Sequence, residues 1–238
     1  MKKVSIITGG SSGLGFHLSS ELLSKDKKVL IVGKNLDRLK NAKLKLESKF
    51  NNNIYTFSCN IGNERDIDNL GNYIKSNDFS IEYLFNNAGR GNESPVKHIT
   101  NKIIDETFES NLKGLILITS KILQLTPSNQ HLTIINIMST SALEGREKES
   151  VYCAAKWGAR GFTEALRKEL KGTKRDIIAV YPGGMKTPFW KTINSKRSIN
   201  DFMDPADVAK KIIESVIYPE KLIISDITIN RKKLCIQT

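Results

Sequence analysis

Thr8-Gly9-Gly10-Ser11-Ser12-Gly13-Leu14-Gly15 is the stretch that decides the fold. It follows directly on a short apolar run, residues 4–7, and opens onto a helical pattern over 14–24. Glycine permits a tight turn here and lets backbone N–H groups approach a pyrophosphate at the N-terminus of the helix. A glycine-rich turn is often only a turn. Its position at the first strand–helix junction nevertheless predicts a dinucleotide site.

The rest of the chain repeats this alternation of apolar strand and helix. Strands are expected over 4–7, 29–32, 54–57, 83–85, 132–137, 177–180 and 222–229. Helices are expected over 14–24, 36–50, 64–75, 102–125, 150–170 and 205–216, with Asn35, Asn63 and Asp204 as N-caps. Several strands are apolar without alternation, which is typical of parallel strands covered on both faces.

This pattern predicts an α/β fold of the Rossmann type, a doubly wound, seven-stranded parallel sheet flanked by helices on both faces. No linker, repeat or low-complexity stretch divides the chain, so we expect a single domain over 1–238. The segment 188–203 has weak periodicity and is the candidate for a mobile substrate lid. Trp190 lies in it and is a candidate substrate contact.

Composition places the chain among globular proteins, with 39% hydrophobic and 26% charged residues. No run approaches the roughly 18 apolar residues of a spanning helix, so we expect no membrane span. The net charge of +12 raises nucleic acid as a partner. The lysines are dispersed, however, and we interpret the charge as solvated surface without a nucleic-acid partner.

The cysteines and histidines give no sign of a disulfide framework or a metal site. Cys59, Cys153 and Cys235 form no CxxC pair, and His17, His98 and His131 are isolated. Cysteines without disulfide partners fit a reducing compartment, so we expect a cytoplasmic location. Because the histidines are isolated as well, we expect no metal site.

The second strand indicates which dinucleotide binds. An NAD site usually ends this strand with a carboxylate that bonds the ribose 2′-hydroxyl. Here the strand ends Val32-Gly33-Lys34-Asn35, and the first acidic residue, Asp37, falls inside the following helix. Lys34 is placed to pair with a 2′-phosphate, so NADP(H) is favoured over NAD(H). The alternative is that Lys34 is only a solvated loop lysine.

Tyr152 and Lys156 indicate the chemistry. Four residues apart on a helix, they project from the same face, one turn above the other. An ammonium beside a phenol favours the phenolate and lowers the tyrosine pKa, which suits proton exchange with an alcohol or carbonyl oxygen. Ser139, upstream, supplies a second hydrogen bond to that oxygen. Alone, this helical pair is more often surface decoration.

The chain resembles the short-chain dehydrogenase/reductase family across nearly its whole length. The matching motifs, in family order, are Thr8-Gly9-x-x-x-Gly13-x-Gly15, Asn86-Asn87-Ala88-Gly89, the four residues Asn111, Ser139, Tyr152 and Lys156, and Pro182-Gly183-x-x-x-Thr187. The resemblance implies that Tyr152 is the general acid or base, that Lys156 lowers its pKa and bonds the nicotinamide ribose, and that Ser139 polarises the substrate carbonyl. It implies that Asn111 anchors a water that passes protons to Lys156.

The resemblance also implies the rest of the cofactor site. Ala88 and Gly89 would pass close to the adenosine, and the segment 182–187 would bracket the nicotinamide. The predicted cofactor-binding residues are Gly9, Ser11, Ser12, Gly13, Leu14, Gly15, Lys34, Asn60, Ile61, Asn87, Ala88, Gly89, Tyr152, Lys156, Pro182, Gly183, Met185 and Thr187.

Three positions depart from the family pattern. Asn60 stands where members usually have an aspartate against the adenine amino group, and its amide oxygen can accept the same hydrogen bond. Met138 replaces a common serine without consequence for the spacing of Ser139. The C-terminal segment from Ser225 to Arg231 lacks the Asp-Gly-Gly ending common in ketoacyl reductases, which puts that assignment in doubt.

Two functions follow. The leading hypothesis is an NADPH-dependent oxidoreductase that moves a hydride between the nicotinamide and a small carbonyl or alcohol substrate, with Tyr152 as general acid/base. The alternative is a catalytically silent NADP(H)-binding regulatory protein, against which the intact Ser139, Tyr152 and Lys156 argue. The resemblance further implies a homodimer or homotetramer built partly on the helix that carries Tyr152.

Overall fold

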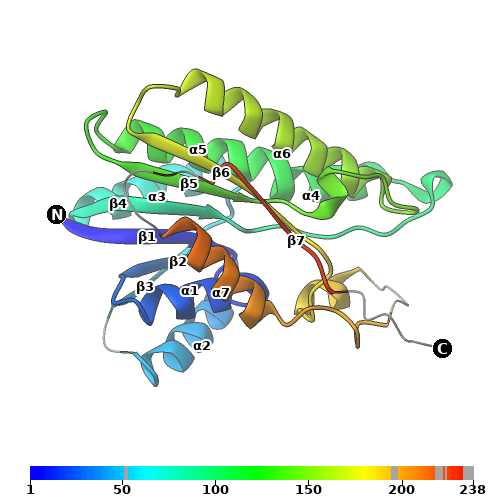
Figure 1. Ribbon diagram of the computed structural model, residues 1–238, viewed down its shortest axis with the longest axis horizontal. Coiled ribbons are helices and arrows are strands. Elements are labelled where there is room, and N and C mark those ends of the chain that lie inside the picture. The colour runs from blue at the N-terminus through cyan, green and yellow to red at the C-terminus, as the bar shows by residue number, and fades with distance from the viewer. Residues whose placement is uncertain (51–52, 194–197, 218–221, 223, 233–238) are drawn as a thin grey trace.

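A seven-stranded, wholly parallel sheet forms the centre of the molecule in the computed structural model (Figure 1). The structure describes residues 1–50, 53–193, 198–217, 222 and 224–232. In chain order the strands are β1 Lys2–Thr8, β2 Val29–Gly33, β3 Ile54–Ser58, β4 Phe79–Asn86, β5 Leu132–Ile137, β6 Arg175–Pro182 and β7 Asp226–Ile229. Their order across the sheet is β3-β2-β1-β4-β5-β6-β7, so the predicted fold class is confirmed.

Helices cover both faces of this sheet. The helices are α1 Gly13–Leu23, α2 Leu36–Glu47, α3 Glu64–Ser76, α4 Asn101–Phe108, α5 Gly114–Leu125, α6 Ser150–Glu169 and α7 Pro205–Val216, with short turns η1 Val96–His98, η3 Thr140–Ala142 and η4 Pro188–Thr192. In Figure 1, α1, α2 and α7 lie on one side of the sheet and α5 and α6 on the other. Successive β1 residues therefore enter different cores, Ile7 with α1 and α7, and Ile6 with α3 and α5.

The strand order reverses between β1 and β4, which are neighbours in space although two strands separate them in the chain. In open parallel sheets, ligands bind at such a switch point, outside the carboxyl ends of the strands. Thr8 joins the two ends, because its Oγ1 accepts the backbone N–H groups of Asn87 and Ala88, each at 3.0 Å. The topology thus assigns a ligand site to this edge.

The predicted helix starts agree with the structure, including three caps. The side chains of Asn35, Asn63 and Asp204 accept from backbone N–H groups in the first turns of α2, α3 and α7. The predicted 36–50 helix ends earlier, at Glu47. The chain then turns back at Phe50, whose N–H bonds the Leu46 carbonyl and whose ring packs on the core.

Two other predicted boundaries were wrong. The last strand begins at Asp226, not at residue 222, because pairing with β6 starts there; Leu222 and Ile224 are exposed, and residue 223 lies outside the described residues. The predicted 102–125 helix is interrupted by η2, a π-helical turn over Glu109–Lys113. A π turn accommodates an extra residue in a helix and is frequent at functional sites. Among the described residues, no helix is long and apolar enough to cross a membrane.

Candidate active site

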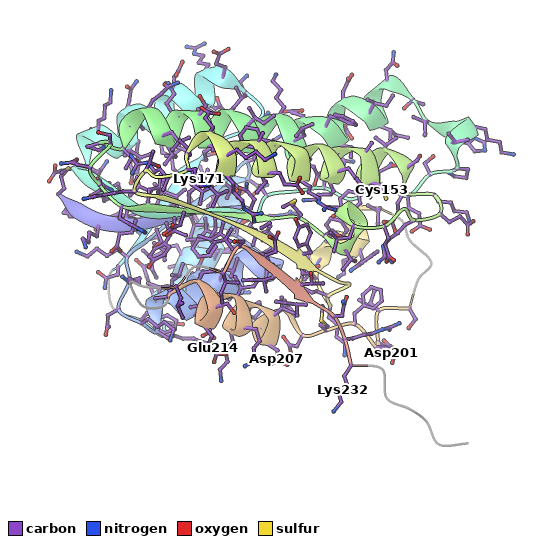
Figure 2. The ribbon with its side chains drawn as sticks, turned by 45° about the horizontal axis from the view of Figure 1, so that its top comes forward. Cys153, Lys171, Asp201, Asp207, Glu214 and Lys232 are labelled. Carbon is purple, nitrogen blue, oxygen red and sulfur yellow. The ribbon has the colours of Figure 1, made fainter. Side chains whose placement is uncertain are left out.

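One cavity of about 780 Å³ lies at the carboxyl edge of the sheet and runs across the switch point. Figure 2 shows Cys153, next to Tyr152, and Lys232, which follows β7, at the same end of the molecule, while Lys171 marks the opposite end of α6. The predicted site residues that line the cavity are Gly9, Ser11, Ser12, Gly13, Leu14, Lys34, Asn60, Ile61, Asn87, Ala88, Gly89, Asn111, Ser139, Tyr152, Lys156, Pro182, Gly183, Met185 and Thr187. The fold therefore brings together residues from nearly the whole chain.

Gly15 is the exception, because it does not line the cavity. A Cβ at this position would lie 2.5 Å from both the Asn87 Nδ2 and the Gly9 carbonyl oxygen. Gly15 thus permits close packing of α1 against the end of β4, and its predicted contact with a cofactor stays a prediction. Gly9 serves both purposes, since it lines the cavity, adopts a φ of +66°, and would place a Cβ 2.9 Å from the Ala88 Cα.

The N-terminus of α1, unlike those of α2, α3 and α7, has no side-chain cap. Ser12 makes no cap hydrogen bond, and the first turn carries no acidic residue. By contrast, α2 and α3 have asparagine caps and acidic residues in their first turns, and Asp204 caps α7. The uncapped N–H groups of α1 face a cavity and carry a positive dipole, which fits an anion such as a pyrophosphate.

Three side chains from three different elements meet at the β2 end of the cavity. Lys34 Nζ lies 3.5 Å from Glu109 Oε1. Asn60 donates from Nδ2 to the same Glu109 oxygen at 2.7 Å, and its Oδ1 accepts the Gly62 N–H at 3.2 Å. The Asn60 amide oxygen thus accepts one hydrogen bond within its own turn and keeps a second lone pair, so its hydrogen bond to an adenine amino group stays a prediction. Arg38, which the sequence reasoning missed, also lines this end.

Tyr152, Lys156 and Ser139 meet at the other end of the cavity, as expected. Tyr152 and Lys156 lie one turn apart on α6, and Lys156 Nζ stands 5.8 Å from the centroid of the tyrosine ring. Tyr152 is only 7% exposed and Lys156 only 4%. Lys156 Nζ donates to the carbonyl of Ile137 at 3.2 Å, which fixes the ammonium against the end of β5.

The ionisation of this pair differs from the expectation that Lys156 lowers the tyrosine pKa. Burial raises the pKa of Tyr152 above its usual value, a hydrogen bond with Ser139 opposes the rise, and the charge of Glu149 adds to it. Burial also lowers the pKa of Lys156 to about 8. Removal from water disfavours the charged form of both groups, and here this cost exceeds the attraction between an ammonium and a phenolate.

Asn111 occupies the centre of the π turn and aims one atom at the Lys156 region. Its Nδ2 donates to the carbonyls of Arg90 at 2.7 Å and Thr107 at 2.9 Å. Its Oδ1 is buried and has no hydrogen-bond partner in the described part of the chain. A Cβ on Gly89 would lie 2.7 Å from this oxygen and 3.5 Å from Lys156 Nζ. An orphaned acceptor beside a lysine suits a bound water between them.

An aromatic wall, defined as Phe189, Trp190 and Phe202, borders the cavity beside Tyr152. The Phe189 ring stands edge-on to Tyr152 with centroids 5.9 Å apart, and Trp190 meets Phe189 at 5.4 Å and Phe202 at 5.0 Å. Trp190 Nε1 donates to the Met185 carbonyl at 2.8 Å. Sequence reasoning singled out only Trp190. The predicted lid, 188–203, includes residues 194–197, which lie outside the described residues.

The segment 182–187 approaches the glycine-rich turn across the cavity. A Cβ on Gly13, whose φ is +54°, would lie 3.3 Å from Thr187 Cβ. The bridge between Met185 and Met203 holds the segment from its other side. The two motifs that are farthest apart in the sequence therefore form facing walls of one site.

This chain belongs to the short chain dehydrogenase family, a family of oxidoreductases, because the sequence profile of that family matches residues 3–198. It is 26% identical over 233 residues to sepiapterin reductase of Chlorobaculum tepidum, with 95% of each chain covered. The crystal structure of a short-chain dehydrogenase/reductase from Vibrio parahaemolyticus has a TM-score of 0.84 at 29% identity, covering 97% of each chain. Serine dehydrogenase, in a closed form complexed with NADP+, shares the fold at 23% identity, a TM-score of 0.84 and coverage of 95% of this chain and 94% of that one. The resemblance stated from the motifs is confirmed.

Proposed function

We propose that the protein is an NADP(H)-dependent oxidoreductase that interconverts a small carbonyl compound and its alcohol. One observation carries the proposal: a single cavity joins the uncapped, glycine-rich N-terminus of α1 to Ser139, Tyr152 and Lys156. The first feature fits a dinucleotide pyrophosphate, and the second is a proton-transfer group beside it. A bound reduced nicotinamide would supply the hydride, and the protein supplies orientation and protons.

Tyr152 is the proposed general acid in reduction and general base in oxidation. Because burial raises its pKa, the phenol stays protonated at neutral pH and is ready to donate to a carbonyl oxygen. Ser139 is proposed to donate a second hydrogen bond to the same oxygen as negative charge develops on it. Their shared position at the buried end of the cavity supports both roles.

Lys156 and Asn111 are proposed to replace the proton that Tyr152 gives away. With a pKa lowered to about 8, Lys156 can both hold and release a proton near neutral pH. The orphaned Asn111 Oδ1 is proposed to hold a water next to the ammonium, through which the proton is replenished. Lys156 is also proposed to bond the nicotinamide ribose.

We propose that Lys34 and Arg38 favour NADP(H) over NAD(H) by pairing with the 2′-phosphate. Both line the β2 end of the cavity, and β2 ends without the carboxylate that would repel a phosphate. That serine dehydrogenase, a protein of the same fold, is complexed with NADP+ agrees with this choice. The other predicted residues around the cavity are proposed to bind the remainder of the cofactor.

The substrate is proposed to be a carbonyl or alcohol compound with an apolar group beside the reacting carbon. The aromatic wall supports this, since Phe189 meets the Tyr152 ring and the wall continues along the cavity through Trp190 to Phe202. We propose that the segment around this wall acts as the substrate lid. The sepiapterin reductase likeness is compatible with a reductase of small carbonyl compounds but does not define the substrate.

We also propose that the chain is a single domain, that it forms a homo-oligomer, and that it is located in the cytoplasm. Trp157 on α6 supports an interface there, because it is 48% exposed although it is a large apolar side chain. Its only described ring contact of the cation–π kind is with Arg160, at 5.7 Å. Light scattering at several concentrations tests the assembly: a monomer at all of them would contradict it.

The test of function follows NADPH absorbance with a broad panel of aldehydes and ketones, alongside direct measurement of NADPH binding. Binding with turnover that Tyr152→Phe abolishes supports the enzyme. Tight binding without turnover on any carbonyl would instead favour a silent NADP(H)-binding regulatory protein. Absence of binding would contradict both.

A further inference from the structure

Asn60, at the β2 end of the cavity, is held by hydrogen bonds within the protein. Its Nδ2 donates to Glu109 Oε1, its Oδ1 accepts from Gly62 N, and its backbone N–H donates to Asp66 Oδ2 at 2.8 Å. The Asn60 side chain is thus fixed by these bonds, and its Oδ1 keeps only one lone pair for a base. A neighbouring carboxylate with a free oxygen offers an adenine amino group a stronger acceptor.

Glu109 is in the right place to be that acceptor. Glu109 is the first residue of the π turn and comes 49 residues after Asn60 in the chain. It lines the same cavity, and 33% of its side chain is exposed. Its stem lies against Gly62, where a Cβ would come within 2.2 Å of Glu109 Cγ, so a glycine at this position makes room for it. Oε1 takes Asn60 and Lys34, whereas Oε2 makes no hydrogen bond to any described residue.

We propose that Glu109 accepts the adenine 6-amino group, replacing the aspartate of the family pattern, and that Asn60 is its positioning residue. This inference rests on the proposed function, because it presupposes that the cavity binds an adenine dinucleotide. The hydrogen bond from Asn60 lowers the pKa of Glu109, so the side chain is a carboxylate at neutral pH and acts only as an acceptor.

Glu109 also holds Lys34, whose side chain is 60% exposed, and an exposed ion pair at 3.5 Å contributes little. Exchange of Glu109 for a 2′-phosphate therefore costs little, and it leaves Oε1 to Asn60 while Oε2 accepts from the base. With a cofactor that lacks the phosphate, Lys34 has no reason to leave Glu109. The pair thus couples recognition of the base to recognition of the phosphate.

The test compares NADPH with its purine analogue, in which a hydrogen replaces the 6-amino group and N1 stays an acceptor. Dissociation constants of both are measured by titration calorimetry without substrate, so that no turnover is involved. A carboxylate accepts from the amino group and gains no hydrogen bond from the hydrogen that replaces it. We expect the unchanged protein to bind NADPH about tenfold more tightly than the analogue.

Glu109→Gln is the main variant, because a neutral amide oxygen accepts more weakly than a carboxylate, and its NH₂ group can donate to N1, which both bases carry. Its ratio of dissociation constants should fall from about tenfold to about twofold or less. Glu106→Gln is the matched control. Glu106 also lines the cavity, but it pairs with Arg90 at 2.7 Å, so the ratio should not change.

Asn60→Ala provides an independent variant, which keeps the carboxylate but removes its orienting hydrogen bond. Its ratio should fall between those of the unchanged protein and Glu109→Gln. An unchanged ratio in both variants would overturn the inference and leave the proposed function intact. If the unchanged protein bound neither dinucleotide, the proposed function would fail first.

Discussion

The two ends of the cavity hold their charges in opposite ways. At the α6 end, Tyr152 and Lys156 are buried, and removal from water shifts the pKa of each toward its neutral form. At the β2 end, Lys34 and Glu109 keep 60% and 33% of their side chains exposed and neutralise each other. Water weakens the interactions between the exposed charges. At the buried end the same interactions are stronger, so gain or loss of one proton has a larger energetic effect.

This difference assigns the tasks. The buried end is suited to move protons, because small changes there alter protonation near neutral pH. The exposed end is suited to choose between cofactors, because a solvated cation exchanges one anion for another at little cost. Variants at the buried end should therefore change rates greatly, and variants at the exposed end should change affinities modestly.

Loss of the phenol should have the largest effect. Tyr152→Phe removes the proposed proton donor, and we expect turnover to fall by about 10³-fold while the NADPH dissociation constant changes by less than about threefold. Tyr181→Phe is the control, since Tyr181 is also buried but bonds Asp226 at 3.2 Å and does not line the cavity. Equal steady-state rates for Tyr152→Phe and the unchanged protein would contradict the role of Tyr152 as proton donor at the buried end of the cavity.

Lys156→Met should separate function from stability. Turnover should fall by about 10²-fold. The free energy of unfolding without cofactor should rise by about 1–3 kcal/mol at pH 7, because a lowering of the lysine pKa from 10.5 to about 8 represents about 3 kcal/mol of unfavourable burial. The lost hydrogen bond to Ile137 offsets part of this gain.

The same lysine sets a pH dependence with a defined sign. Between pH 8 and pH 10 the unfolded chain keeps the Lys156 proton and the folded chain loses it, so this lysine should make the free energy of unfolding increase with pH in this window. Urea unfolding at pH 7, 8, 9 and 10 measures the slope, which Lys156→Met should flatten. Burial raises the pKa of Cys59 to about 12 and also raises that of Tyr152, which opposes this gain above about pH 9, so the lysine's contribution is the difference in slope between the unchanged protein and Lys156→Met. A wild-type slope no steeper than that of the variant would contradict the buried-charge account.

Ser12→Asp tests the uncapped start of α1. An aspartate here should cap the helix as Asn35 caps α2, and stabilise the protein by about 0.5–1 kcal/mol. The same carboxylate should repel a pyrophosphate and weaken NADPH binding at least tenfold, by roughly the cost of opposing like charges. Asn63→Asp at the start of α3 is the control and should leave binding unchanged. A Ser12→Asp variant that is more stable but binds NADPH with unchanged affinity would contradict binding of the pyrophosphate at the N-terminus of α1.

The smallest effect is expected at the exposed end. Lys34→Ala should reduce the preference for NADPH over NADH by about fivefold, since Arg38 remains to hold a phosphate. Lys40→Ala on the exposed part of α2 is the matched control, because Lys40 does not line the cavity. Dissociation constants of both nucleotides for each variant provide the measurement. A change of equal size for NADH and NADPH would show that Lys34 does not contact a 2′-phosphate.

Much of this site was predictable because its chemistry lies in short, local patterns. The glycine-rich turn and the Tyr152–Lys156 spacing each depend on neighbours within one or two helical turns, and both occupy the expected places. The contacts of Glu109 and of the aromatic wall were not predictable, because they join residues that are distant in the sequence. Asn60 and Glu109, which share a hydrogen bond, are 49 residues apart.

The pKa values of Tyr152 and Lys156 could not be predicted from their spacing in the sequence either. Four residues of separation place an ammonium near a phenol, but they say nothing of the solvent around either group. Only the packed structure shows that both are buried and that burial controls both pKa values. Similarly, the helical periodicity of 102–125 gave no sign of the π turn that orients Asn111.

The most direct test of the account is a crystal structure of the protein with NADP+ bound. We expect the pyrophosphate at the N-terminus of α1, the 2′-phosphate within hydrogen-bonding distance of Lys34 or Arg38, and the nicotinamide beside Tyr152. A dinucleotide bound in the reverse direction, or outside the cavity, would contradict the division of tasks between its two ends.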